Sequence, residues 1–213
     1  MYTPPIQDQK FVLEYLIGFD SIVQQLSMNG QNTEEIDKDL IWSILDEAGK
    51  FASTVLAPIN HTGDQQNSTI TEEGYVRTPD GFKEAYRAMC EAGWTTLEAK
   101  SEWGGQQMPM SVSAAVCEMW HSANMSFALC HLLSQGQIYA LQKSASQEQK
   151  ETYLPNLVSG KWTGTMNLTE PQAGTDLSKI RTKAVREGDH YKISGQKIYI
   201  TYGEHDMAEN IIH

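Results

Sequence analysis

Residues 153–176, YLPNLVSGKWTGTMNLTEPQAGTD, contain the point at which the pattern of the chain changes. Before Gly160, apolar side chains recur every three or four residues, which is the spacing of one face of a helix. From Trp162 onward the residues alternate in polarity and β-branched types become frequent, as in strands. The sequence therefore predicts an all-α helical bundle over residues 1–160. The opening strands of an antiparallel β domain follow over residues 161–213, which makes an α+β fold.

Several stretches of the first part have helical spacing. The predicted helices cover residues 8–27, 33–58, 79–93, 110–122, 125–143 and 147–158. Asn32 with Glu35, and Ser146 with Gln149, have the spacing of a capping box at the start of the second and the last of these helices. The polar residues 60–78 are expected to form a long surface loop. Because the helices over 110–122 and 125–143 carry few charges, we expect them to be buried within the bundle.

The second part shows the period of strands and turns. Strands are predicted to begin between residues 161 and 170, and further strands are expected over residues 178–186, 190–194 and 196–201. Gly188 and Gly195 mark the turns between them. The chain ends on an apolar, strand-like run around Ile211 with no predicted partner strand after it. We therefore expect the sequence to be part of a longer chain.

The composition limits the classes of function. The chain has 27 acidic and 16 basic residues, a formal net charge of -11, which opposes non-specific binding to nucleic acid. No apolar run approaches the roughly 18 residues that a membrane span needs. The start resembles neither a secretory signal nor a transit peptide, so a cytoplasmic location is expected. Cys90, Cys117 and Cys130 are widely spaced, which favours buried thiols over a disulfide or a metal site.

Residues 166–176, MNLTEPQAGTD, offer hydroxyl groups and open backbone in a loop that leaves a predicted strand. Thr169, Gly174 and Thr175 are positioned to present O–H and N–H donors to the edge of an electron-rich ring or to a phosphate. An ordinary turn explains the same residues equally well. The segment therefore marks a candidate binding loop without identifying the ligand.

Residues 195–201, GQKIYIT, place Tyr199 and Thr201 two positions apart, on one face of a predicted strand. An aromatic ring beside a hydroxyl group suits a flat heterocycle, since the ring provides stacking and the hydroxyl a hydrogen bond. A core aromatic next to a β-forming threonine is the better interpretation of this segment by itself. The two segments gain meaning only when they are considered together.

In this order, after a helical first part, the two segments resemble the acyl-CoA dehydrogenase family, in which they read TEPxAGSD and GxKx(W/F/Y)IT. Residues 147–160, QEQKETYLPNLVSG, resemble the EEQKxxYLPxLxxG segment of the same family. The resemblance covers residues 80–213. The stretch before it and residues 201–206, TYGEHD, look like a longer-chain subgroup that includes the methylthiopropanoyl-CoA dehydrogenases.

The resemblance implies an FAD cofactor and assigns residues to it. Residues 166–175 would border the flavin, with Thr169 donating to its pyrimidine side, Tyr199 packing on the ring and Thr201 bonding near N5. Thr175 would lie where the flavin and the CoA arm meet and would also contact substrate. The implied cofactor contacts are Met166, Leu168, Thr169, Gly174, Thr175, Tyr199, Ile200 and Thr201. Gln172, Thr175 and Tyr199 depart from the commoner Gly, Ser and Trp, which puts the substrate role of Thr175 most in doubt.

The resemblance also implies the reaction of the whole enzyme. An acyl-CoA thioester would lose its Cα proton to a glutamate and a hydride from Cβ to flavin N5, giving the trans-2-enoyl-CoA. In the family that base comes from a carboxyl-terminal helical domain, which the sequence lacks, so no catalytic residue is assigned and the chain by itself is expected to be inactive. Electron-transferring flavoprotein is the expected electron acceptor, and homo-oligomers would form largely through the missing domain.

Two alternatives stay open at this point. One is a flavin-binding family member with changed chemistry, such as an alkylation-response protein or an oxidase, and the other is a helical module without enzymatic activity.

Three further groups of residues have simpler interpretations. Glu204, His205 and Asp206 are adjacent and would point in different directions, which argues against a metal site. His121 and His131 are expected to be core histidines. Residues 124–127 are expected to pack in the core rather than to line an acyl pocket.

Overall fold

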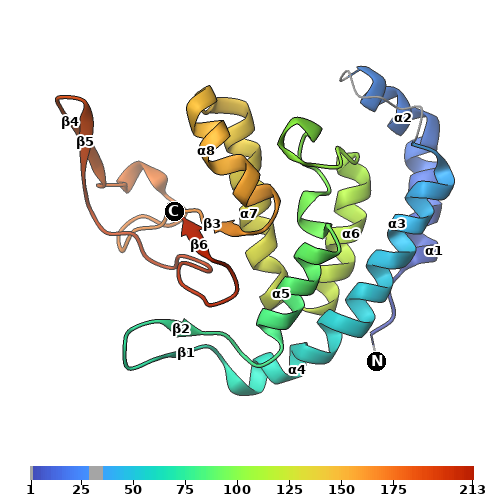
Figure 1. Ribbon diagram of the computed structural model, residues 1–213, viewed down its shortest axis with the longest axis horizontal. Coiled ribbons are helices and arrows are strands. Elements are labelled where there is room, and N and C mark those ends of the chain that lie inside the picture. Colours follow the sequence, from blue (N-terminus) through green and yellow to red (C-terminus); the bar gives the residue numbers. More distant parts are fainter. Residues whose placement is uncertain (1, 29–35) are drawn as a thin grey trace.

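The computed structural model describes residues 2–28 and 36–213. Its helices pack side by side (Figure 1), and most of the strands follow them in the sequence. The helices are α1 (Ile6–Phe11), α2 (Phe19–Met28), α3 (Lys38–Phe51), α4 (Ala57–Gln66), α5 (Phe82–Glu91), α6 (Met110–Ala123), α7 (Met125–Ser144) and α8 (Gln147–Val158). The first strand after them is β3 (Trp162–Gly164). The predicted change from helix to strand after Gly160 is therefore confirmed.

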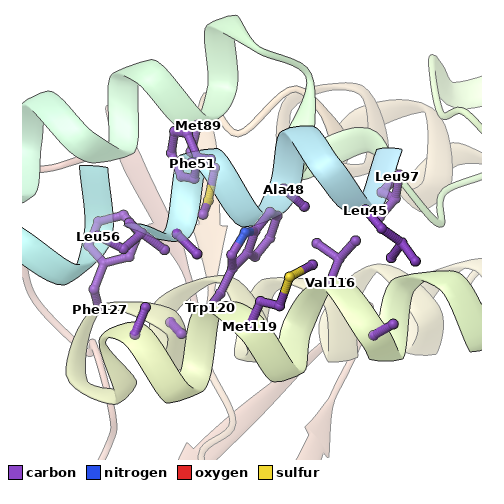
Figure 2. Close-up of a cluster of buried hydrophobic side chains, with 14 of the residues drawn as sticks. Leu45, Ala48, Phe51, Leu56, Met89, Leu97, Val116, Met119, Trp120 and Phe127 are labelled. Atoms are coloured by element: carbon purple, nitrogen blue, oxygen red, sulfur yellow. The ribbon is translucent and has the colours of Figure 1, made fainter. Parts of the chain in front are cut away.

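The main hydrophobic core lies where α3 meets α6, with α5 and α7 alongside (Figure 2). Trp120 of α6 is at its centre and is 1% exposed. Its ring meets Phe51 of α3 edge-on with centroids 6.1 Å apart, and Trp94 edge-on at 5.5 Å. Edge-to-face pairs of this kind stabilise a core by about 0.5–1.5 kcal/mol beyond the burial of their area. The helical stripes in the sequence thus converge on one aromatic centre.

The two charge-poor helices, α6 and α7, are not enclosed on all sides as predicted. Each buries one face, and the largest buried side chains include Val112, Met119, Trp120 and Phe127. Large apolar side chains on the other faces are exposed, among them Met110, Met125, Leu132 and Tyr139. The prediction that both helices are enclosed in the bundle is therefore wrong for these outer faces. Low charge alone did not distinguish the covered face from the open one.

The ends of the second helix differ from the prediction. The described helix α3 begins at Lys38, and Asp37 caps it by accepting a hydrogen bond of 2.7 Å from the Leu40 N–H. The predicted cap, Asn32 with Glu35, lies outside the described residues. At the other end the helix does not stop at Pro58 but continues through a π-helical turn, Ala52–Leu56, into α4. Pro58 lies in the first turn of α4, directly after the π-helical turn, so it falls within a continuous helix.

The predicted surface loop is consequently shorter. α4 takes up residues as far as Gln66, and a small antiparallel hairpin of β1 (Thr69–Ile70) and β2 (Val76–Arg77) follows. The third predicted helix corresponds to α5, and Gly93 follows its end with a φ of 75°, as a helix-terminating glycine does. The loop before α6 holds two short 3₁₀ turns, Trp94–Thr96 and Ser101–Trp103.

The last helix, α8, begins with the predicted capping box. The Gln149 N–H donates to Ser146 Oγ at 3.3 Å, and the Ser146 N–H donates to Gln149 Oε1 at 3.0 Å. Replacing Ser146 with alanine is expected to lower the free energy of unfolding by about 1 kcal/mol, because an N–H at the helix start loses its acceptor. Urea unfolding followed by circular dichroism measures this loss. The matched control is Ser68→Ala at an exposed loop position, and equal losses in both variants would contradict the capping role.

The strands do not form the predicted antiparallel sheet. β3 pairs in parallel with β6 (Asn210–Ile212), and β4 (Lys183–Glu187) pairs with β5 (His190–Ser194) in a separate antiparallel hairpin. The hairpin extends away from the helices in Figure 1. The prediction of a strand over residues 178–186 is correct only at its end, since Leu177–Lys179 form a 3₁₀ turn. The predicted strand over residues 190–194 is confirmed as β5.

Candidate flavin site

The first motif forms a tight turn shortly after β3. The Glu170 N–H donates to the Ala173 carbonyl at 2.9 Å, and the Ala173 N–H donates back to the Glu170 carbonyl at 3.0 Å. Ala173 is buried beneath the turn, whereas the two residues at its tip are exposed. The turn leaves Thr169 on one side, and Gly174 and Thr175 on the other. A Cβ added at Gly174 would meet no atom within 4 Å, so the backbone there is open to a ligand.

The second motif lies directly beside the first. The Ile198 N–H donates to the Thr169 carbonyl at 2.9 Å, and Lys197 Nζ donates to the Leu168 carbonyl at 2.9 Å. Residues far apart in the sequence thus share one surface. The Thr169 loop and the second motif therefore lie side by side.

The predicted strand over residues 196–201 is not formed. Tyr199 and Tyr202 have backbone φ angles of 56° and 54°, in the left-handed region, so the extended conformation is interrupted on both sides of Thr201. Side chains alternate between two faces only in an extended strand. The prediction that Tyr199 and Thr201 share one strand face is therefore wrong. Tyr199 is 88% exposed, so it is not a core aromatic.

All of the predicted cofactor contacts reach the surface. Leu168, Thr169 and Ile200 are half-buried, and Met166, Gly174, Thr175, Tyr199 and Thr201 are exposed. Met166 is 63% exposed, which, like the exposure of Tyr199, is high for a large side chain of this kind. The surface therefore combines apolar faces, hydroxyl groups and open backbone. This donor set suits a flat ring with a polar edge.

Glu170 was not assigned a role from the sequence, although it is the most constrained residue of the loop. Its side chain is buried, and both carboxylate oxygens accept hydrogen bonds from the backbone N–H groups of Arg181 and Thr182, at 2.7 and 3.0 Å. The Thr182 side chain, the Arg181 N–H and the Lys197 ammonium group lower the pKa of Glu170 well below its ordinary value. The sequence held one indication of this role, which is a carboxylate residue, Glu170, within the first motif.

The segment after the second motif attaches to the helical part. Asp206 Oδ1 accepts hydrogen bonds from the Thr78 N–H at 3.1 Å and from the Thr78 hydroxyl at 2.6 Å. The Tyr202 hydroxyl donates to the Ser126 carbonyl at the start of α7, at 2.6 Å. These bonds connect residues more than seventy positions apart. They fix the segment that follows Thr201 against the bundle.

His205 is buried between β3 and α7 and has its hydrogen bonds satisfied. The Met207 N–H donates to His205 Nδ1 at 3.1 Å, so the ring proton is on Nε2, which donates to Thr163 Oγ1 at 2.9 Å. Burial lowers the pKa of His205 to about 4. Across residues 2–28 and 36–213, no group of His, Cys, Asp or Glu side chains is arranged to hold a metal ion. The hydrogen bonds of His205 and Asp206 join the segment after the second motif to β3 and to Thr78.

The core predictions for the remaining candidates hold in part. His131, Asn124 and Phe127 are buried, whereas His121 is half-buried, and Met125 and Ser126 are exposed. His131 is buried edge-on against Trp120, with ring centroids 5.4 Å apart, and burial lowers its pKa to about 4. His121 Nδ1 lies 2.7 Å from the Cys117 carbonyl. Asn124 caps α7 by accepting a hydrogen bond from the Phe127 N–H at 3.1 Å. All three cysteines are free thiols, and Cys130 is the one that is fully buried.

Comparison with known proteins identifies the family. The pattern described as "Acyl-CoA dehydrogenase, N-terminal domain" matches residues 42–161, which is more than half of the chain. The chain belongs to the acyl-CoA dehydrogenase family. Members of this family depend on FAD. The match covers α3 to α8, and the two motifs that meet at the candidate site follow it.

Several named acyl-CoA dehydrogenases are similar to this chain. It is 44% identical over 213 residues to the 3-methylmercaptopropionyl-CoA dehydrogenase of Ruegeria pomeroyi. The aligned region covers all of this chain and 35% of the relative. The chain is 38% identical over 179 residues to a butyryl-CoA dehydrogenase of Syntrophomonas wolfei, covering 82% of this chain and 29% of the relative. The chain thus spans about a third of the length of these relatives.

Solved structures agree with the assignment. The butyryl-CoA dehydrogenase of Megasphaera elsdenii has a TM-score of 0.62 and 25% identity to this chain, over 80% of this chain and 43% of that one. A glutaryl-CoA dehydrogenase of Mycobacterium smegmatis shares the fold with a TM-score of 0.66 over 84% of this chain. Within residues 2–28 and 36–213, none of the helices is long and apolar enough to cross a membrane.

Proposed function

We propose that this chain contributes part of the FAD site and of the substrate side of an enzyme that converts an acyl-CoA thioester to the trans-2-enoyl-CoA. The proposal is carried by the hydrogen bonds between the Thr169 loop and residues 197 and 198, because the two family motifs meet there. FAD, when bound, accepts the hydride that leaves Cβ of the substrate. The chain's own residues hold the ring in place and exclude water from its face.

Each exposed residue of the site has a role in this proposal. The Tyr199 ring and the Met166 side chain pack on the flat cofactor, since both are large and exposed. Thr169 donates to its pyrimidine side and Thr201 near its N5. Thr175 contacts both the cofactor and the CoA arm of the substrate. Leu168, Gly174 and Ile200 complete the wall.

The proton at Cα requires a carboxylate base. Glu170 is the buried carboxylate among the described residues, but its oxygens are occupied by hydrogen bonds, and its lowered pKa makes it a weak base. Its place beneath the turn also keeps it away from the open face. We therefore propose that the base comes from outside residues 1–213 and that the chain by itself does not turn over substrate.

The finer parts of the function are also proposals. Short acyl-CoA thioesters, with 3-methylmercaptopropionyl-CoA first, are the substrates to test, because the relative at 44% identity carries that name. Electron-transferring flavoprotein is the proposed electron acceptor, and the whole enzyme is proposed to be a cytoplasmic homo-oligomer of acyl-thioester metabolism. Residues 1–160 would form its amino-terminal helical domain and residues 161–213 the start of its β domain.

The flavin assignment is tested by mapping FAD on the chain by nuclear magnetic resonance. FAD added in millimolar amounts is expected to shift the amide signals of residues 166–175 and 199–201, and to leave the β4–β5 hairpin unchanged. Tyr199→Ser should weaken FAD binding by about fivefold, because one stacking contact is worth about 1 kcal/mol. Tyr191→Ser is the matched control, since Tyr191 is also an exposed tyrosine but lies on the hairpin.

Two results would contradict the proposal. Amide shifts confined to the helices, or no shifts in a folded chain, would remove the flavin assignment of this surface. Reduction of a dye acceptor by the isolated chain with an acyl-CoA thioester would show that residues 1–213 do contain a base. Shifts at the predicted residues would also argue against a purely structural helical module.

A further inference from the structure

The Glu170 side chain joins three separate parts of the chain. Its Oε2 accepts from the Arg181 N–H at 2.7 Å and from Gln172 Nε2 at 2.5 Å. Its Oε1 accepts from the Thr182 N–H at 3.0 Å and from Lys197 Nζ at 2.9 Å. The carboxylate therefore connects its own loop to the stretch before β4 and to the second motif. Four donors around one carboxylate leave little freedom for its position.

Lys197 completes the connection from the other side. Its ammonium group binds the Glu170 carboxylate and also donates to the Leu168 carbonyl at 2.9 Å. The pair is enclosed, because the side chain of Glu170 is 2% exposed and that of Lys197 is 20% exposed. The ion pair between Lys192 and Glu187 has the same length of 2.9 Å, but its side chains are 77% and 53% exposed. Exposed pairs contribute little to stability, whereas removing one partner of an enclosed pair leaves a costly lone charge.

The backbone by itself holds the two motifs together only weakly. One backbone hydrogen bond, from the Ile198 N–H to the Thr169 carbonyl, joins them within the described chain, and residues 195–200 belong to no strand. Gly195 permits the close approach of this segment to Thr182, since a Cβ there would lie 2.3 Å from Thr182 Oγ1. Without a ladder of hydrogen bonds, the spacing between the motifs depends on side chains. Glu170 and Lys197 are the side chains that span it.

We propose that Glu170 and Lys197 are positioning residues that fix the distance between the Thr169 loop and the 197–201 segment, and so hold the two halves of the flavin wall in register. This inference rests on the proposed flavin function for its purpose, although the contacts themselves do not. Neither residue needs to touch the cofactor. Their effect passes through the Leu168 and Thr169 carbonyls and the Ile198 N–H, which carry the exposed residues on either side.

The first test measures hydrogen exchange at the Ile198 amide, which does not require FAD. Glu170→Gln and Lys197→Met are each expected to speed exchange at this amide by at least about tenfold, because local opening becomes easier when one charge stays buried alone. The Phe127 amide in the α7 cap should be unaffected and shows that the bundle remains folded. Lys192→Met, which removes the exposed pair, is the matched control and should leave Ile198 unchanged.

The double variant Glu170→Gln with Lys197→Met has two uses. If a single variant unfolds, the double variant is compared with the wild type alone, and exchange of the Ile198 amide at the wild-type rate in the folded double variant overturns the inference. If both single variants fold, the double variant measures how the two residues act together. Since it leaves no lone charge, its exchange is expected to be slower than the product of the two single effects predicts. The inference is overturned if Ile198 exchange stays at the wild-type rate in both single variants, or if the two effects simply multiply. Lys197→Arg, which keeps the charge, is expected to restore part of the protection.

FAD mapping separates this inference from the proposed function. In Glu170→Gln, FAD is expected to lose its shifts at residues 166–175 or 199–201 while the bundle signals remain. Equal FAD shifts in wild type and Glu170→Gln would overturn the positioning role and support the flavin assignment. A third outcome is that FAD shifts no signals of the wild type, while Ile198 exchange is faster in the single variants. That outcome would support the fixed spacing of the two motifs and overturn the flavin assignment.

Discussion

Replacing Trp120 with alanine is expected to lower the free energy of unfolding by about 3–5 kcal/mol, the usual loss for a large buried aromatic side chain. Trp120 is 1% exposed and contacts Phe51, Trp94 and His131 edge-on. Its Nε1 has no hydrogen-bond partner among the described residues, so we expect the loss to arise mainly from packing. The cavity would open where α3 meets α6, at the cluster of side chains shown in Figure 2. Chemical denaturation followed by circular dichroism measures the change.

The control for this variant is Tyr75→Ala, because Tyr75 is a large aromatic side chain that is 65% exposed in a loop. Its removal should change the free energy of unfolding by no more than about 0.5 kcal/mol. A loss below about 1 kcal/mol in Trp120→Ala would contradict the position of Trp120 at the centre of the core. Such a result would also weaken the placement of α7, since His131 packs on the same ring.

The helices were predictable because their signals are local. The stripe of apolar side chains and the capping pair of Ser146 and Gln149 lie within a few turns of each other in the sequence. The failures at helix ends have the same origin. Pro58 suggested a stop, but after a π-helical turn it starts α4, and only the structure shows that turn. The outer faces of α6 and α7 were misjudged because the burial of a face depends on what packs against it.

The strands were less predictable because their partners are distant in the sequence. β3 pairs in parallel with β6, and no pattern within either strand indicates this choice. The motifs of the site were found from their residue types, and the hydrogen bonds of residues 197 and 198 show that they are adjacent. The left-handed conformation of Tyr199 was not indicated, since a tyrosine rarely adopts it. Glu170 was missed because its partners, Arg181, Thr182 and Lys197, come from other segments.

Mild acid is expected to destabilise the fold through two buried histidines. Burial, together with the nearby His121, lowers the pKa of His131 to about 4, and burial lowers that of His205 to about 4 against an opposing effect of Asp206. The unfolded chain therefore binds more protons than the folded chain between pH 4 and 6.5, so stability rises with pH across this window and is lost as pH falls through it. Between pH 7.5 and 4.5 each histidine should cost about 2–3 kcal/mol, since one pKa unit is worth about 1.4 kcal/mol.

Variants assign this loss to the histidines. In His205→Gln the decrease of the free energy of unfolding between pH 7.5 and 4.5 should be about half that of the wild type, because one of the two titrating groups is removed. His190→Gln, a change at an exposed position of the β4–β5 hairpin, should keep the full decrease. Glu170 and Asp206 have lowered pKa values, so the stability they contribute is lost mainly below about pH 4.5, at the acid end of this window and beyond it. An equal acid sensitivity in His205→Gln and wild type would show that His205 is not buried in its neutral form against Thr163, and would remove the contact that joins β3 to the segment after the second motif.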